Sequence, residues 1–183
     1  EQLKAIPDVN LAARAGKLFK ESSTEAELTG RIARYRGALG NSTDSAKGKV
    51  VYQKNCIVCH KIGDEGNEVG PSLGSITGKP DESVLMDILD PNGKIEPEYK
   101  LYLISAKGGK VHAGVLASES PTSVILKRVD GGTDVILRKD IIKMTASEMS
   151  LMPANLHAQM SPQDVADLIA FLRMTFAGNP KSQ

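Results

Sequence analysis

A five-residue motif that holds both cysteines of the chain constrains its fold and chemistry more than any other feature. The residues are Cys56-Ile57-Val58-Cys59-His60, and C-x-x-C-H is the pattern of haem attachment through thioether bonds. Two thiols three residues apart on a helical turn can add to the two vinyl groups at one edge of a haem, and the next residue then places its imidazole under the iron. The motif therefore predicts one covalently bound haem c, attached to Cys56 and Cys59 and ligated by His60.

Three other uses of such a cysteine pair fit the rest of the sequence less well. A structural zinc site needs four ligands, but the remaining candidates, His112 and His157, are 45 residues apart and lack the usual paired spacing. A thioredoxin-like redox pair needs a βαβ pattern, which is absent before Cys56. A simple disulfide between two cysteines this close in sequence is less favoured still, so haem attachment is the leading interpretation.

Charge and hydropathy argue against several classes of partner. The formal net charge is +1, from 23 Lys and Arg against 22 Asp and Glu, so no global basic field indicates nucleic acid or anionic lipid. The longest apolar runs have the length of a strand, far below the ~20 residues that span a bilayer, and we expect no transmembrane segment. Residues 1–8 lack the basic start and apolar stretch of a signal peptide, which suggests a mature chain or a piece of a longer product.

Apolar residues at helical spacing predict helices on both sides of the motif. Ser23 or Thr24 can cap the second of them and Ser161 the last. Residues 63–78, rich in Gly and Pro, are expected to form an irregular loop. The predicted helices are two short ones within residues 11–39, with a break at 22–24, one from Thr43 or Ser45 into the motif, one over residues 80–90 and one over residues 161–176.

Between residues 98 and 144 the pattern changes to short alternating runs, most of them separated by Gly-Gly or Ser-Pro turns. This pattern is typical of antiparallel strands. We therefore predict a mainly α protein with a small antiparallel β insert and an N-terminal helical extension. The predicted division is residues 1–42 for the N-terminal helical extension, 43–97 with 145–183 for the haem domain, and 98–144 for the inserted β module.

The helical segments resemble a class I cytochrome c. Gly48, Tyr52 and Cys56 follow one another at steps of four, like the glycine and the aromatic residue of that family's N-terminal helix. The resemblance implies the class I cytochrome c fold, in which such a glycine permits a close crossing with the C-terminal helix, here at Leu168 and Phe171. It covers residues 43–97 and 145–178.

A second part of the resemblance is Gly70-Pro71-Ser72-Leu73. It is similar to the family's loop in which a proline carbonyl accepts a hydrogen bond from the proximal histidine. The resemblance implies that Pro71 does this for His60, and such a bond orients the imidazole and raises its basicity. Leu73 is expected among the apolar residues that exclude water from the porphyrin.

The order of the segments carries a narrower resemblance. With the β insert and Ser150-Leu151-Met152-Pro153 in their places, the chain is similar to the haem-binding domain at the C-terminus of large secreted proteins of planctomycetes and verrucomicrobia. This likeness covers residues 43–178 and leaves out residues 1–40.

The sixth ligand of the iron is predicted from spacing. Met152 lies 92 residues after His60, and without the 47 residues of the insert the separation is 45, similar to that in small class I cytochromes. Met152-Pro153 also resembles the family's axial Met-Pro. Met160 is expected to serve as the hydrophobic staple of the last helix, and His157 is the main rival because imidazole binds iron at least as readily. The candidates weighed are Met149, Met152, Met160, His112 and His157.

Ligation by His60 and Met152 would close the iron to substrates and raise its potential relative to ligation by two histidines. We therefore expect an electron-transfer protein and not an enzyme. The protein would carry electrons between a donor and an acceptor redox protein, either free or as a domain of a larger oxidoreductase. The alternative is a haem-based gas sensor or a peroxidase-like enzyme with a displaceable sixth ligand. Carbon monoxide binding to the reduced protein discriminates the two.

Location and assembly follow less directly. Haem c is attached outside the cytoplasmic membrane in bacteria, as the resemblance implies, so a periplasmic or otherwise extracytoplasmic location is expected. The β insert has eight Lys and Arg against five Asp and Glu between residues 98 and 144, which makes it a candidate for docking a partner. The N-terminal helices are expected to pack on the core or on a second copy in a homodimer.

Overall fold

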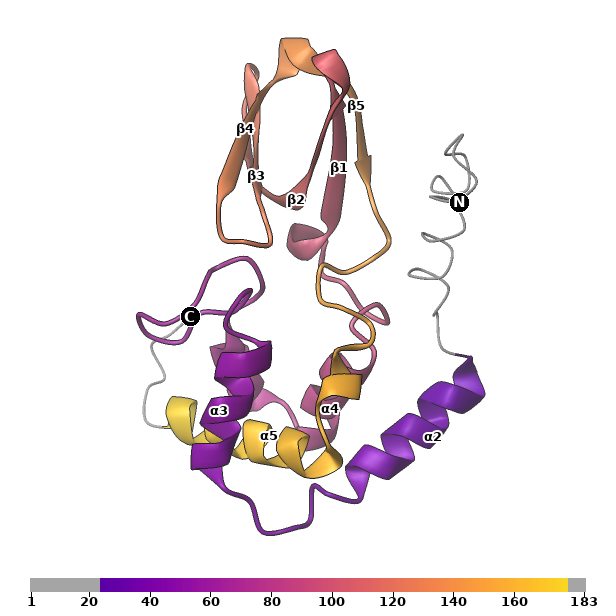
Figure 1. Cartoon of the computed structure of the whole chain (residues 1–183), viewed down its shortest axis with the longest axis vertical. Coiled ribbons are helices and arrows are strands. Elements are labelled where there is room, and N and C mark those ends of the chain that lie inside the picture. Colours follow the sequence, from indigo (N-terminus) through magenta and orange to yellow (C-terminus); the bar gives the residue numbers. More distant parts are fainter. Residues whose placement is uncertain (1–23, 178–183) are drawn as a thin grey trace.

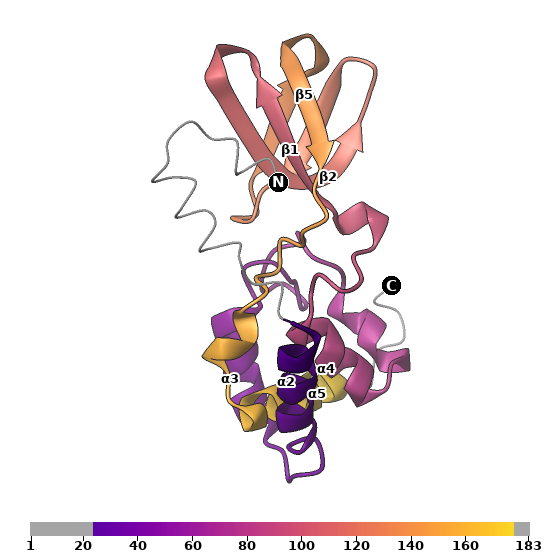
Figure 2. The same ribbon diagram turned by 90° about the vertical axis from the view of Figure 1, so that its right-hand side faces the viewer.

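The computed structural model describes residues 24–177. Its α-helices gather at one end of the long axis and a sheet stands at the other (Figures 1 and 2). The α-helices are α2 (Glu25–Arg36), α3 (Ser45–Asn55), α4 (Asp81–Leu89) and α5 (Pro162–Ala177), and the 3₁₀ helices are η2 (Leu73–Gly78), η3 (Pro97–Tyr99), η4 (Lys107–Gly109), η5 (Arg138–Asp140) and η6 (Leu156–Gln159). No helix in this part of the chain is both long enough and apolar enough to cross a membrane.

Helix α2 begins where the sequence predicts it. The Thr24 hydroxyl accepts from the backbone N–H of Glu27 at 3.3 Å, and the Glu27 carboxylate accepts from the backbone N–H of Thr24 at 2.8 Å, which forms a capping box. Near its C-terminal end, the helix buries Tyr35 in the helical core. This part of the N-terminal extension therefore packs on the core, whereas the helix expected before residue 22 lies outside the described residues.

Helix α3 is capped by a residue that the sequence analysis passed over. Asp44 is the N-cap, between the two expected positions, and its carboxylate accepts from the backbone N–H groups of Ala46 and Lys47 at 3.0 and 3.2 Å. An acidic cap satisfies two helix N–H groups and complements the helix dipole. The cap thereby fixes the start of this eleven-residue helix, which ends at Asn55.

Helices α3 and α5 cross at Gly48. A Cβ atom on this glycine would lie 2.0 Å from the carbonyl oxygen of Asp167 and 2.7 Å from Cβ of Phe171. The expected close crossing is present, and it is made at Asp167 and Phe171, one residue before the expected Leu168. Only glycine allows two helix backbones to approach this closely.

The helical part has one apolar core. It is made by the inward faces of α2, α3, α4 and α5, with Tyr52, Leu85 and Leu89 among its most deeply buried side chains. Several apolar residues near the motif pack against it while remaining partly exposed, namely Cys56, Ile57, Ile62, Leu73 and Met152. These residues mark the side of the core on which the candidate site lies.

The strands form one antiparallel sheet in the order β4-β3-β2-β1-β5. Val124 and Leu126 on β3 and Ile104 on β1 are fully buried, in a core separate from that of the helices. Alternate residues point to opposite faces of a strand, so the alternating sequence gives one buried face. The strands are β1 (Leu101–Ala106), β2 (Lys110–Glu119), β3 (Ser123–Lys127), β4 (Thr133–Leu137) and β5 (Ile141–Ala146).

The prediction of a mainly α fold is wrong. Of the described chain, 44% is helical and 22% lies in strands, with the five-stranded sheet as a full structural layer. Strand β2 runs ten residues, beyond its apolar alternation to Glu119, and β5 continues to Ala146. Backbone pairing extends these strands past the residues whose side chains alternate between apolar and polar. The sequence alternation therefore underestimated the lengths of the strands.

Candidate haem-binding site

The motif forms a tight turn at the end of α3. The Cys56 N–H donates to the carbonyl of Tyr52 at 2.8 Å, and the carbonyl of Cys56 accepts from the N–H groups of Cys59 at 3.1 Å and His60 at 2.9 Å. The helix thus passes directly into the turn, which brings the two thiols and the imidazole onto one short stretch of fixed backbone. Both cysteines are free thiols and partly buried.

The remaining carbonyls of the motif are held by other residues. Asn67 donates from its backbone N–H to Ile57 at 3.2 Å and from its side-chain amide to Val58 at 2.9 Å. The N–H groups of Val69 and Gly70 donate to Cys59 at 3.0 and 2.7 Å. The loop after the motif therefore folds back over it and ties its backbone in place.

The buried phenol of Tyr52 completes this arrangement. Its hydroxyl lies 2.8 Å from the carbonyl of His60, and its ring packs 5.8 Å from the ring of Phe171. One side chain thus connects the crossing of α3 and α5 to the end of the motif.

The His60 ring is oriented by Gly70 and Pro71. Nδ1 of His60 lies 2.8 Å from the carbonyl oxygen of Pro71, and because a carbonyl only accepts, Nδ1 carries the proton and Nε2 keeps its lone pair. A Cβ atom on Gly70 would lie 2.6 Å from Cε1 of His60, so only glycine lets the loop lie against the imidazole. The hydrogen bond expected between His60 and Pro71 is present.

Electrostatics favour neutral side chains in the turn. Burial lowers the pKa of His60 below its usual range, although the hydrogen bond to Pro71 opposes the shift. Burial and then the neighbouring Cys59 raise the pKa of the Cys56 thiol to about 12, and burial also raises the pKa of Cys59. Reactive redox cysteines have lowered pKa values, so this pair does not have the character of a thioredoxin-like site.

The candidates for the sixth ligand lie in different surroundings. Met152 is partly buried beside the helical core, and its backbone N–H donates to the Ser150 hydroxyl at 3.1 Å. Met160 is buried in that core, as expected of a staple, and Met149 is 38% exposed. His112 lies on β2, where its Nδ1 is 2.6 Å from the Asp134 carboxylate.

The segment that follows Met152 is held by the N-terminal extension. The Tyr35 hydroxyl lies 2.7 Å from the carbonyl of His157 and 2.8 Å from that of Met160. The rings of Tyr35 and His157 also meet edge to face, with centroids 6.2 Å apart. Sequence analysis missed this role of Tyr35, for which the only signal was its place in an apolar helical stripe.

The residues after Leu73 are held by α5. Arg173 donates to the Asp81 carboxylate at 2.9 Å and to the carbonyls of Ile76 and Lys79. This guanidinium fixes η2, which carries the partly buried Leu73 and the buried Ile76 against the helical core. The predicted site residues thus come from three segments, and Cys56, Leu73 and Met152, one from each, pack against the helical core.

Residues 45–102 match the family model described as Cytochrome c. The match likens this segment, called the cytochrome c domain below, to that family. It contains α3, the motif, the Gly70-Pro71 loop and α4, and it ends at the first strand. This cytochrome c domain supports a c-type cytochrome that binds haem and carries electrons. No curated protein matches the chain.

The residues of the cytochrome c domain fit a haem c. The proton on Nδ1 leaves Nε2 of His60 as an acceptor for a metal, and the loop at Gly70 lies directly against the imidazole ring. Two thiols precede it at the spacing of thioether attachment, and partly buried apolar side chains stand beside them. This donor set suits an iron porphyrin bound through one histidine.

Proposed function

We propose that the protein is a single-haem c-type cytochrome that carries electrons between two redox proteins. Cys56 and Cys59 would hold the haem through thioether bonds, and His60 and Met152 would ligate its iron. The observation that carries the proposal is the His60 ring, whose Nδ1 is fixed by Pro71 and whose Nε2 is thereby reserved for iron. The bound haem supplies a one-electron couple, and the residues of the chain set its environment.

Each residue has a defined part in this mechanism. The Pro71 carbonyl holds the proton on Nδ1 of His60 and increases electron donation by the imidazole. Leu73 and Ile57, partly buried beside the helical core, would keep water from the porphyrin, which would favour a raised potential. Val58, between the two cysteines, is 50% exposed, so the turn that would hold the haem reaches the surface, where a redox partner could approach it.

A thioether as sixth ligand favours electron transfer over bond-making chemistry. Met152 lies on the short segment between Ser150 and η6. The backbone N–H of Met152 donates to the Ser150 hydroxyl, and the backbone N–H of Ser150 donates to the Asn92 side chain at 2.8 Å. These bonds limit movement of the segment that carries Met152. We therefore propose an electron carrier without catalytic activity of its own, either free or as a domain of a larger oxidoreductase.

The proposal extends to the location and architecture of the protein. Attachment of haem c implies a periplasmic or otherwise extracytoplasmic location. The haem domain is assigned to residues 43–97 with 145–183, the β module to residues 98–144 and the N-terminal extension to residues 1–42. The order of these segments is similar to that of the planctomycete and verrucomicrobial type of haem-binding domain. This order alone supports assigning the protein to that group.

Spectra of the chain produced together with a haem c attachment system test the proposal. We expect the mass of one haem to remain on the denatured chain, a c-type ferrous spectrum, a ferric sulfur-to-iron charge-transfer band and no change on adding carbon monoxide. Met152→Ala should abolish the charge-transfer band and admit carbon monoxide. Met174→Ala is the matched control, since Met174 on α5 is 64% exposed.

Two results would refute parts of this proposal. Loss of haem on denaturation would exclude thioether attachment at Cys56 and Cys59. Carbon monoxide binding to the unaltered ferrous protein would instead favour the gas sensor or peroxidase-like reading with an open sixth position.

A further inference from the structure

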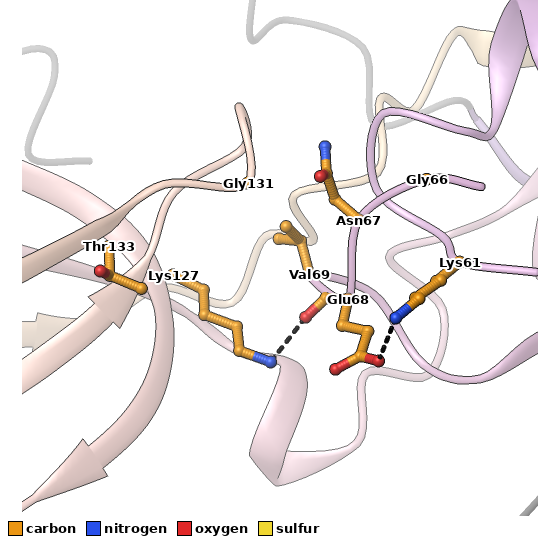
Figure 3. A pocket seen from close by; sticks show the side chains of 8 residues that line it. All are labelled: Lys61, Gly66, Asn67, Glu68, Val69, Lys127, Gly131 and Thr133. Atoms are coloured by element: carbon orange, nitrogen blue, oxygen red, sulfur yellow. Dashed lines mark hydrogen bonds and ion pairs between the residues drawn. The ribbon is translucent and has the colours of Figure 1, made fainter. Parts of the chain in front are cut away.

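The turn between β3 and β4 reaches the loop that covers the motif (Figure 3). Nζ of Lys127, at the end of β3, donates to the backbone carbonyl of Glu68 at 2.7 Å. A Cβ atom on Gly131, in the turn itself, would lie 2.5 Å from the side-chain amide of Asn67. The sheet has its own core, yet this hairpin lies in direct contact with the loop of the cytochrome c domain.

The contacted loop residues are those that hold the motif. Asn67 donates to Val58, and the N–H of Val69, the residue after Glu68, donates to Cys59. The peptide between Glu68 and Val69 therefore accepts from Lys127 on its oxygen and donates to Cys59 from its nitrogen. Hydrogen bonds in such a chain polarise one another, so each strengthens the next.

The chain of bonds continues to the proposed iron ligand. The peptide between Cys59 and His60 accepts from Val69 and donates from the His60 nitrogen to the carbonyl of Cys56 at 2.9 Å. Three peptide groups thus link the ammonium of Lys127 to the turn that carries both thiols and the imidazole. A charged donor at one end makes a stronger bond than a neutral one.

The Glu68 side chain does not compete for this cation. Its carboxylate pairs with Lys61 at 3.3 Å, and Figure 3 shows Lys61 and Lys127 approaching Glu68 at different oxygens. A hollow of about 230 Å³ opens beside them, lined by these residues, Asn67 and Thr133. Water therefore reaches the hydrogen bond between Lys127 and Glu68. Loss of this bond should loosen the loop without unfolding the protein.

We propose that the β3–β4 hairpin is a positioning element of the haem site, in which Lys127 acts through the Glu68–Val69 peptide to hold the turn from Cys56 to His60. The inference rests on the proposed function, because the position of His60 is important only if His60 ligates the haem iron. It assigns to the sheet a role inside the haem site that does not depend on docking a partner.

The test measures amide hydrogen exchange in the full-length, haem-loaded protein. Lys127→Met keeps the aliphatic stem and removes the donor, and we expect exchange at Val69 to become roughly three- to tenfold faster. Lys127→Arg keeps a charged donor and should restore most of the protection. The matched control is Lys143→Met, which removes the same charge from β5 at the opposite edge of the sheet.

A second readout reports on the ligand itself. In the ferric protein, Lys127→Met should displace the paramagnetically shifted proton resonances of the His60 ring, whereas Lys143→Met should leave them in place. A purely structural role of Lys127 in the sheet would change thermal stability without moving these resonances. Unchanged exchange at Val69 in Lys127→Met, or an equal change in Lys143→Met, would overturn the proposal.

Two glycine variants test the contact at the turn. Gly131 and Gly109 both have positive φ, +82° and +72°, but only Gly131 has a neighbour within 4 Å of an added Cβ. Gly131→Ala should push the side-chain amide of Asn67 away from the Val58 carbonyl and speed hydrogen exchange of that side-chain amide. Gly109→Ala carries similar backbone strain but should leave this exchange unchanged. Equal effects of the two would refute the contact.

The failure of this inference is distinguishable from failure of the proposed function. If no haem is attached, the proposed function fails, and exchange at Val69 in the haem-free chain still decides whether Lys127 holds the loop. If haem is attached normally and Lys127→Met changes neither exchange nor the His60 resonances, only the inference fails.

Discussion

Replacing Gly70 with alanine tests the geometry of the proposed proximal site. The added Cβ would lie 2.6 Å from Cε1, 3.0 Å from Nδ1 and 3.1 Å from Nε2 of His60, and relief to an ordinary contact needs a shift of about 1 Å. Such a shift would lengthen the 2.8 Å separation of Nδ1 and the Pro71 carbonyl beyond hydrogen-bonding range. Overpacking of this kind costs about 1–3 kcal/mol, so the melting temperature should fall by roughly 2–10 °C.

The same variant should raise the reduction potential. The bond from Nδ1 to Pro71 increases electron donation to iron and stabilises the ferric form. If its net value of about 0.5–1.5 kcal/mol were lost from that form alone, the midpoint potential would rise by roughly 20–60 mV, at 59 mV for each tenfold change. Redox titration and thermal unfolding measure the two effects.

The control for this experiment is Gly78→Ala. Gly78 has no atom within 4 Å of an added Cβ and no positive φ, so alanine there should leave the potential unchanged and stability equal or slightly higher. Equal melting temperatures and potentials in Gly70→Ala and Gly78→Ala would show that the loop has room beside His60, and the reasoning would be wrong.

Further predictions concern the helices and the thiols. Gly48→Ala should lower the melting temperature by roughly 2–8 °C through its clash at the helix crossing, whereas Gly30→Ala in α2, which has nothing within 4 Å, should raise it by a few degrees. Tyr35→Phe removes a donor to two carbonyls and should cost about 1–2 kcal/mol in urea unfolding, while Tyr102→Phe on β1 should be nearly neutral. In haem-free protein at pH 8, the pKa of Cys56, raised from 9.0 to about 12, should slow alkylation about thirtyfold relative to the chain in urea; equal rates would contradict its burial.

Features that depend on neighbours in sequence could be predicted, and long-range contacts could not. The capping box of α2, the apolar face of α4 and the alternation of β3 are local patterns, and the structure has all three. The bond between His60 and Pro71 spans eleven residues and came from a family resemblance. Lys127 and Glu68 are 59 residues apart, and no periodicity marks either, so nothing in the sequence pointed to their contact.

The two segments outside the family match both brace the matched cytochrome c domain. From the N-terminal side, Arg31 on α2 donates to the last carbonyl of α4, that of Leu89, at 3.0 Å. From the sheet, Lys127 holds the loop over the motif.

These braces have a physical reason. A loop rich in Gly and Pro loses much conformational entropy when it is ordered, and few of its own side chains are buried to offset that loss. Hydrogen bonds from Lys127 on the β3–β4 hairpin and from Arg173 on α5 reach the loop from elements that are already ordered, so they fix it with little further loss of entropy. The geometry around His60 therefore also depends on residues outside the family match, and residues 45–102 alone would lose Lys127, Arg173 and the α5 side of the Gly48 crossing.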